Sequence, residues 1–500
     1  MRSRDDDAAV DVDADVGADA AVDGDDGRNA RFLALTRAGK PAWDSRGVSS
    51  ESVTLCAAVQ ALAANAEAQG GGELEGVDYA GRALGCASTS TMIYVASSAE
   101  GESVGVLRKK LKYVEDVMTS CVTNAALVGA LGKNTRFDVR RAMAVATLAD
   151  ERLHELATRG LRRDTAYVFD TYRTVGMSHE ARRSATRAMG DALRLVTKPF
   201  AGVAFGIGDG RLVTYVKPRG HRPQTISARD VMVLMNYARA TSRSGESMKK
   251  EGEDEGDATH AESFGRVCLP EFNPDGFMHA YVSYIEAKSG DTEAREGDEE
   301  KNDAVASSST SRERVGVCFL TASADALEEC RAARDALEKR LNADDTLTTI
   351  ARAARRQLRV SDVPEDVLGR YQVEHDEPLL HFVYNRPARQ QHVSSAFASS
   401  VSDDRSIETI TRAYAMMYEN MTELDGTVDA TTKPPIEHSA QRVRYERRKR
   451  HSVLACVGGD FEIYLTFKPS ATVTVAVAMC NRLCVWLRVS EPELFLENVV

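Results

Sequence analysis

Apolar residues along the chain recur first at the spacing typical of strands and then at the spacing typical of helices, and this order occurs three times. In the first unit, short or alternating apolar runs predict strands, and apolar positions three or four apart predict helices. The expected strands are 31–36, 42–43, 82–87 and 91–97, and the expected helices begin at Ser49 or Ser50, run from Val104 to Val122, and run from Phe137 to about Leu156. In the helix after Ser50, the residues expected to face inward are Val53, Cys56, Ala57 and 59–62.

The second and third units show a similar order of elements. The second is expected to contain strands 201–207, 212–216, 265–269, 277–285 and 315–320, and helices from Ser227 and from Ser323 to Leu341. The third is expected to contain strands 380–384, 451–457 and 461–467, and helices from Ser406 and from Ala471 to Val489. Because tight turns join several neighbouring strands, antiparallel pairing is expected. The predicted fold class is α/β in the α+β sense, with three units that each place an antiparallel sheet against flanking helices.

Charged stretches indicate a tail before the first unit and two insertions within the second unit. The N-terminal segment is rich in Asp and Ala and lacks the apolar residues that would offset the cost of ordering a backbone, so a disordered acidic tail is expected. Two stretches rich in Glu, Asp, Ser and Gly are predicted to be insertions in surface loops. The expected organisation is a tail at 1–28, a first domain at 29–160, a second domain at 161–355 with insertions at 243–262 and 288–314, and a third domain at 356–500.

Composition narrows the classes of function. The chain has 500 residues and a formal net charge of −11, and an acidic chain is not expected to be a general binder of nucleic acid. Its first residues lack the apolar stretch of a signal peptide, and no segment approaches the ~20 apolar residues of a spanning helix. Nine cysteines without metal-binding spacing favour a reducing compartment. A cytoplasmic protein that reaches membranes through its surface is expected, with no metal and no cofactor.

The sequence contains no catalytic motif in a fitting context. The patterns GxxxxGK[ST], HExxH and GxSxG are absent. The glycine-rich segment 206–210 lies between two predicted strands, so a hairpin turn is expected there; a phosphate-binding loop should open a helix. No residue is therefore assigned as an acid, base or nucleophile, and covalent chemistry is not expected.

One dense basic cluster contrasts with the acidic chain around it. Its candidate lipid-binding residues are Arg444, Arg447, Arg448, Lys449 and Arg450. One interpretation is a strand edge that charge protects from aggregation. The other is contact with anionic lipid headgroups, since each Lys or Arg near a charged leaflet can contribute ~1 kcal/mol. A second basic stretch, 133–141, is either an exposed connector or a contact for an acidic partner.

Several strings resemble the SAND/Mon family. The most specific are VCLPEFN at 267–273 and GFMHAYV at 276–282, which resemble the family's "ICLPxFNxxGFLHAYV". FLALTRAGKP at 32–41 and NTRFDVRR at 134–141 resemble two strings of its first domain, although the family's following "LLGG" is replaced here by AMAV. HFVY at 381–384 and DFEIYLTF at 460–467 resemble strings of its third domain.

The resemblance implies three longin domains and an obligate partner subunit of similar architecture. It also implies a guanine-nucleotide exchange factor that activates the Rab GTPase of late endosomes and vacuoles, recruited peripherally to an anionic phosphoinositide membrane surface. The first domain would then face the GTPase, and the candidate contacts are Lys40, Trp43, Arg46 and Arg136. The rival hypothesis is a coat or tethering scaffold without exchange activity, because longin folds also serve as passive interaction modules.

Overall fold

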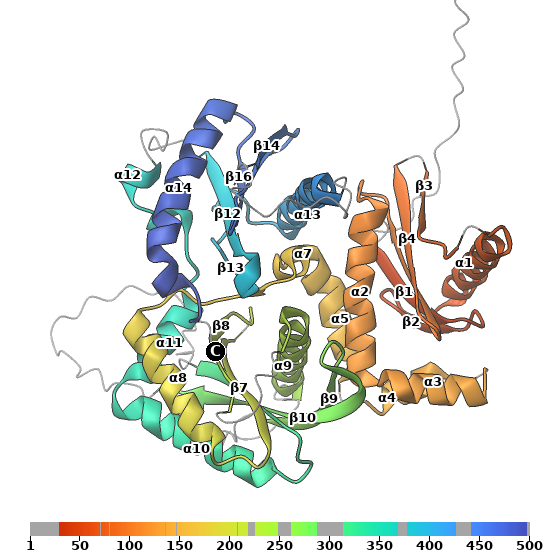
Figure 1. Cartoon of the computed structure of the whole chain (residues 1–500), viewed down its shortest axis with the longest axis horizontal. Helices are drawn as coiled ribbons and strands as arrows, with labels where there is room; N and C mark the ends of the chain where they lie inside the picture. The colour runs from red at the N-terminus through yellow and green to blue at the C-terminus, as the bar shows by residue number, and fades with distance from the viewer. Residues whose placement is uncertain are drawn as a thin grey trace, which may run out of the picture.

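Three sheets, each covered by helices on both faces, make up the chain (Figure 1). The computed structural model describes residues 30–70, 72–79, 81–135, 137–146, 148–207, 209–218, 226–248, 262–287, 314–368, 378–426 and 442–497. The expected acidic tail and most of the two expected insertions lie outside these ranges. The predicted fold class of three antiparallel α/β units is confirmed.

The first sheet has the strand order β2-β1-β5-β4-β3, and every neighbouring pair is antiparallel. Helix α1 covers one face and helix α2 the other (Figure 1). Helix α2 packs closely on β4 because Gly85 has no side chain; a Cβ there would lie 2.8 Å from Cβ of Leu107. The elements of this unit are β1 (Arg31–Thr36), β2 (Pro41–Asp44), α1 (Ser50–Ala68), β3 (Gly76–Tyr79), β4 (Arg82–Ser88), β5 (Met92–Ser98), α2 (Val104–Cys121), α3 (Asn124–Lys133), α4 (Val139–Ala144) and α5 (Ala149–Glu155).

The helix expected from Phe137 to about Leu156 is wrong as a single element. Helix α4 ends at Ala144, and Leu148 has a left-handed backbone with φ of 54°, which ends regular helix for an L-residue with a bulky side chain. A π-helical turn (Leu156–Gly160) follows α5, and two short helices, α6 (Leu161–Arg163) and α7 (Ala166–Phe169), lead out of the first unit.

The second sheet has the order β8-β7-β11-β10-β9 and is also fully antiparallel. Helix α9 covers one face, and helices α8, α10 and α11 cover the other (Figure 1). The expected hairpin between residues 207 and 212 is confirmed. The elements are α8 (His179–Leu193), β7 (Pro199–Gly206), β8 (Leu212–Val216), α9 (Ala228–Met248), β9 (Ser263–Leu269), β10 (Asn273–Glu286), β11 (Arg314–Thr321), α10 (Leu327–Ala343) and α11 (Thr346–Arg355).

The third sheet has the order β14-β15-β16-β12-β13-β6, with α13 on one face and α14 on the other. Its last strand, β6, comes from the segment before α8 and pairs with β13 in parallel. The elements are β6 (Tyr172–Arg173), α12 (Glu365–Leu368), β12 (Leu379–Arg386), β13 (Gln391–Ser394), α13 (Asp404–Gly426), β14 (Arg442–Arg447), β15 (Ser452–Val457), β16 (Glu462–Phe467) and α14 (Val473–Leu494).

Helix α14 is long and apolar enough to cross a membrane by length and composition, which the sequence reading did not anticipate. Its inner face, including Met479, Leu483 and Leu487, packs into the core of the third sheet. Only 33% of the apolar window of α14 is buried, and Val485 and Val489 on its outer face are 67% and 77% exposed.

Candidate functional site: docking surfaces of the first and third domains

A buried ion pair fixes the corner where β2 leads into α1. The Arg31 guanidinium donates from Nε and Nη2 to the Asp44 carboxylate, with the closest contact at 2.7 Å. The Ser52 hydroxyl donates to the same carboxylate at 2.6 Å, and Ser49 caps α1. The side chain of Asp44 is 0% exposed and that of Arg31 is 6% exposed. The start of α1 is therefore held rigidly against the sheet.

Helix α1 presents an apolar face outward as well as inward. Its buried residues are Ser52, Cys56, Val59 and Ala63. The expectation that Val53, Ala57 and Leu62 face inward is wrong: Val53 is 52% exposed and Leu62 is 44% exposed. The apolar residues of this outer face are Val53, Ala57, Ala58, Ala61, Leu62 and Ala64. A helix that is apolar on nearly all sides is typically covered on all sides, so this face is a candidate surface for another protein.

Two segments far apart in the sequence meet beside β2. Lys40 Nζ lies 3.4 Å from Asp138 Oδ2, and Trp43 and Phe137 pack against the same core. Asp138 also accepts two hydrogen bonds from the Arg140 guanidinium at 3.0 Å, and these bonds lower the pKa of Asp138 to about 2. The two strings that resemble the first domain of the SAND/Mon family thus meet at the β2 edge of the first sheet.

The four residues predicted to face the GTPase differ in their positions. Lys40 lies in the turn before β2 and is ion-paired, so it already has one acidic partner. Trp43 is half-buried on β2, on the α2 side of the sheet, and Arg46 is exposed just before α1. Arg136 lies outside the described residues. Lys40 and Trp43 therefore belong to the edge beside Asp138, whereas Arg46 lies near the start of α1.

The basic cluster forms the outer edge of the third sheet. Residues 442–447 are strand β14, which pairs only with β15 in the described sheet. Glu446 lies 3.0 Å from Nε of Arg444 and 3.0 Å from Nη2 of Arg448. Arg447, Lys449 and Arg450 are exposed, and in the described part of the chain no acidic group lies within ion-pair distance of them. Three of the five candidate lipid-binding residues thus remain available to an anionic surface.

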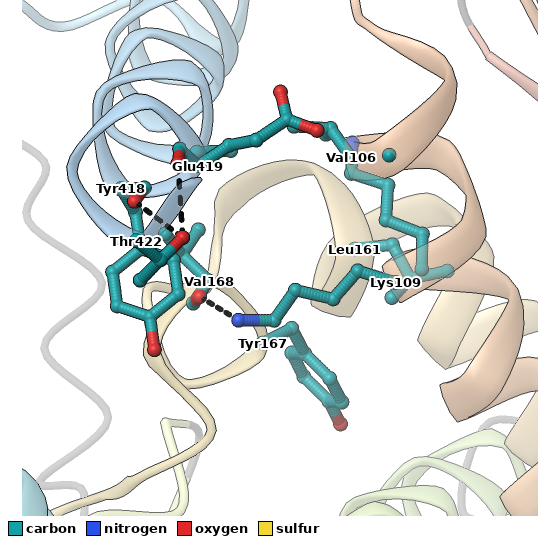
Figure 2. Close-up of a pocket in the computed structure, with 11 residues that line it drawn as sticks. Val106, Lys109, Leu161, Tyr167, Val168, Tyr418, Glu419 and Thr422 are labelled. Carbon is teal, nitrogen blue, oxygen red and sulfur yellow. Dashed lines mark hydrogen bonds between the residues drawn. The ribbon is translucent and has the colours of Figure 1, made fainter. Parts of the chain in front are cut away.

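A small pocket lies between the first and third domains, where α2 faces α13 (Figure 2). Its volume is about 100 Å³, enough for a few water molecules. Lys109 extends from α2 across the pocket, and its Nζ donates to the carbonyl oxygen of Val168 at 2.6 Å. The same ammonium lies 4.1 Å from the centre of the Tyr418 ring and 2.8 Å from Asp170. Burial lowers the pKa of Lys109, and Asp170 opposes that effect. This pocket joins two domains and is too small for a substrate.

In the part of the chain that the structure describes, cysteines and metal-binding side chains are not gathered into a reactive centre. All nine cysteines are buried, and burial raises the pKa of the Cys86, Cys318 and Cys330 thiols, which disfavours the reactive thiolate. Within the described ranges, no group of three or more His, Cys, Asp or Glu side chains is arranged to hold a metal ion.

Comparison with known proteins shows to which family the chain belongs. Models described as the first, second and third longin domains of FUZ, MON1 and HPS1 match residues 30–148, 204–337 and 378–491. A vacuolar fusion protein MON1 homolog of Oryza sativa subsp. japonica is 24% identical over 94% of this chain and 75% of its own length. The chain belongs to the MON1/SAND family.

Other members of the MON1/SAND family match over a similar extent. The vacuolar fusion protein MON1 homolog B of Homo sapiens is 22% identical over 92% of this chain and 74% of its own length. Protein SAND of Takifugu rubripes is 22% identical over 92% of this chain and 75% of its own length. The predicted SAND/Mon resemblance and the three longin domains are therefore confirmed.

Proposed function

We propose that this MON1/SAND chain is one subunit of a heterodimeric guanine-nucleotide exchange factor for a Rab GTPase of late endosomes or vacuoles, and that it supports vacuolar fusion. Two of the relatives named above, from Oryza sativa and Homo sapiens, are called vacuolar fusion proteins, which supports the cellular role. The observation that carries the molecular proposal is the apolar outer face of α1, beside the edge that contains Lys40, Trp43 and Asp138.

The occupant that we assign to the outer face of α1 is the first longin domain of a partner subunit. Most of its outward residues are alanines, and small side chains allow the close approach of another helix. The face between Val53 and Ala64 carries no charged residue, which suits a permanent, desolvated contact better than a transient one. The neighbouring charged edge would then lie at the rim of the joint surface and contact the GTPase.

Exchange of nucleotide requires no reactive side chain in the exchange factor. A GTPase holds its nucleotide through its phosphate-binding loop and magnesium. A protein that binds the nucleotide-free GTPase more tightly than the loaded form shifts the population toward release, by as much as the two affinities differ. In this proposal the chain acts only through its surfaces, without covalent chemistry.

The third domain would bring the complex to its membrane. Arg447, Lys449 and Arg450 lie together at the β14 edge and would contact anionic phosphoinositide headgroups, so that a cytoplasmic protein is recruited peripherally. This part of the proposal is independent of nucleotide exchange and is tested separately below.

The test is co-expression with a candidate three-longin partner, followed by release of a fluorescent nucleotide from a panel of Rab proteins. Val53→Asp with Leu62→Asp should abolish both co-purification and exchange. The matched control is Val485→Asp with Val489→Asp, which places the same charges at exposed valines of α14 and should change neither result. Co-purification without acceleration of any Rab protein would instead support a coat or tethering scaffold.

A further inference from the structure

A cavity of about 420 Å³ lies where the segment after the first domain meets the second and third domains. Its wall is built from the segment that joins the first domain to the second, from the β7–β8 hairpin, and from the third domain around β12, β13 and the start of α13. This volume is within the range of ~300–1,000 Å³ that is typical of sites for small molecules. The proposed exchange activity makes no use of this cavity.

The floor of the cavity is a network of paired charges. Asp164 lies 3.3 Å from Nε of Arg173 and 3.0 Å from Nη2 of Arg239. Asp209 lies 2.5 Å from Nε of Arg211, and its carbonyl oxygen accepts from Nη2 of Arg173 at 2.7 Å. Burial by itself raises the pKa of Asp164, but the charges of Arg173 and Arg239 outweigh this effect and hold that pKa at about 2. Asp164 is therefore ionised at neutral pH.

Two arginines in the wall keep hydrogen-bond donors that the protein does not use. Arg163 contacts Asp404 through Nη1 at 2.7 Å and Glu408 through Nε at 3.1 Å, which leaves Nη2 without an acceptor among the described residues. Arg173 uses Nε and Nη2, and its Nη1 has no acceptor in the same ranges. Both residues line the cavity. Neither Arg163 Nη2 nor Arg173 Nη1 is among the buried nitrogens that lack a hydrogen-bond partner.

The opposite part of the wall adds neutral donors. The hydroxyl oxygen of Ser395 accepts from the backbone N–H of Phe382 at 3.0 Å, so its own proton is available to a ligand. Ser394, next to it, also lines the cavity.

The balance of charge in the wall favours an anion. Four guanidinium groups line the cavity against three carboxylates, Asp164, Asp209 and Asp404. The first two carboxylates are held by arginines of the floor. Behind the wall, the positive charge of Arg239 at Asp164 is matched by the carboxylate of Glu408 at Arg163, so the wall keeps an excess of one guanidinium group. Asp404 is at the rim, where its side chain is 66% exposed and screened by water. Guanidinium forks match the geometry of phosphate oxygens, which accept two parallel hydrogen bonds.

We propose that this cavity binds a small soluble phosphate ester, whose oxygens accept from Arg163 Nη2 and Arg173 Nη1 and which links the segment after the first domain to the second and third domains. The ligand would act as a structural anion, because it would contact the domain linker, the second-domain hairpin and the third domain at once. Binding only to the folded chain would raise its stability in proportion to ligand concentration.

The experiment uses the full chain and myo-inositol hexakisphosphate as the probe, with titration calorimetry and thermal unfolding as readouts. The wild type should bind and unfold at a higher temperature with the probe. Arg163→Gln should weaken binding by about tenfold or more, the contribution of one charge-assisted hydrogen bond. The matched control is Arg187→Gln at an exposed position of α8, which should bind like the wild type. Unfolding of each variant without the probe separates lost binding from lost folding, and Arg163→Lys should restore binding only in part.

Vesicles that contain phosphatidylinositol 3-phosphate distinguish the source of the phosphate. Arg163→Gln should not change vesicle binding, because the cavity is assigned to a soluble ester. A loss of vesicle binding without a loss of probe binding would overturn the proposal in favour of a lipid headgroup. Equal affinity of Arg163→Gln and the wild type for the probe, or no binding by the wild type, would also overturn it. None of these three outcomes bears on nucleotide exchange, which is measured by nucleotide release from the Rab protein.

Discussion

Replacement of Asp44 by alanine would remove the one buried acidic partner that Arg31 has among the described residues. Three nitrogen contacts link these two side chains, and the Arg31 pKa is raised mainly by its hydrogen bond to Asp44. The remaining acidic partner, Glu51, lies 2.7 Å from Nη1 but is itself 74% exposed. The substitution therefore leaves a positive charge in the interior between β2 and α1 with weak compensation.

The expected loss of stability follows from this geometry. Breaking a buried ion pair by removing one partner costs about 3–5 kcal/mol. Because Glu51 still contacts Arg31, we expect the lower end, about 3 kcal/mol. With a urea dependence of about 2 kcal/mol per M for a unit of this size, the midpoint of unfolding would fall by about 1.5 M. Asp44→Asn keeps one oxygen acceptor and should lose about half as much.

The chain itself provides a local reporter for this measurement. It has two tryptophans, Trp43 next to Asp44 and Trp486 on α14. In a Trp486→Phe background, fluorescence in urea follows the first domain through Trp43 alone.

Glu51→Ala is the matched control, because it removes the exposed acid from the same arginine. Exposed pairs contribute about 0–1 kcal/mol, so its midpoint should fall by less than about 0.5 M. If Asp44→Ala lowered the midpoint no more than Glu51→Ala, the buried pair would not stabilise the β2–α1 corner and the reasoning would be refuted.

Three further outcomes are expected. Replacement of Arg447, Lys449 and Arg450 by Glu should weaken binding to phosphatidylinositol 3-phosphate vesicles by on the order of 100-fold. Replacement of the exposed Arg183 and Arg187 by Glu should leave vesicle binding unchanged. If both variants sedimented equally with the vesicles, the assignment of these residues to lipid binding would be wrong. Burial, and to a smaller extent the charge of Arg173, lowers the pKa of His381 and of His392 to about 3 in the folded chain. The pKa of an unfolded histidine is ~6.5, so between these two values the unfolded chain binds more protons than the folded chain. The free energy of unfolding therefore falls as the pH drops below ~6.5. Together the two histidines should cost the third domain about 3 kcal/mol between pH 8 and pH 5.5, followed by Trp486 fluorescence in a Trp43→Phe background, and a pH-independent midpoint would contradict this. Gly85→Ala should lower the free energy of unfolding by about 1–3 kcal/mol, because the added Cβ would overlap Leu107. Gly129→Ala on α3 has open space around it and should be neutral or stabilising. Similar urea midpoints for the two variants would argue against close packing of α2 on β4.

The candidate surfaces show which features can be predicted from sequence patterns and which cannot. The basic residues of β14 are visible in the sequence because charge density is a local property. The pairing of Glu446 with Arg444 and Arg448 was not predicted, because it depends on the strand conformation that brings alternate side chains together. The apolar outer face of α1 was misplaced because the helix is apolar on nearly every side, so its period does not distinguish the face against the sheet. That lack of a polar face was itself the signal for a docking surface.

The sequence alone determined the three α/β units, most of their central strands and the family strings, because these follow from hydrophobic periods and turn residues within short windows. It missed helices α3, α8 and α11 and the short strands β3, β6 and β13. Only the tertiary structure decided that Lys40 meets Asp138, that β6 joins the third sheet, and that a cavity lies between the domains. Each of these depends on contacts between residues about a hundred or more positions apart, and such contacts leave no periodic signal in a single sequence.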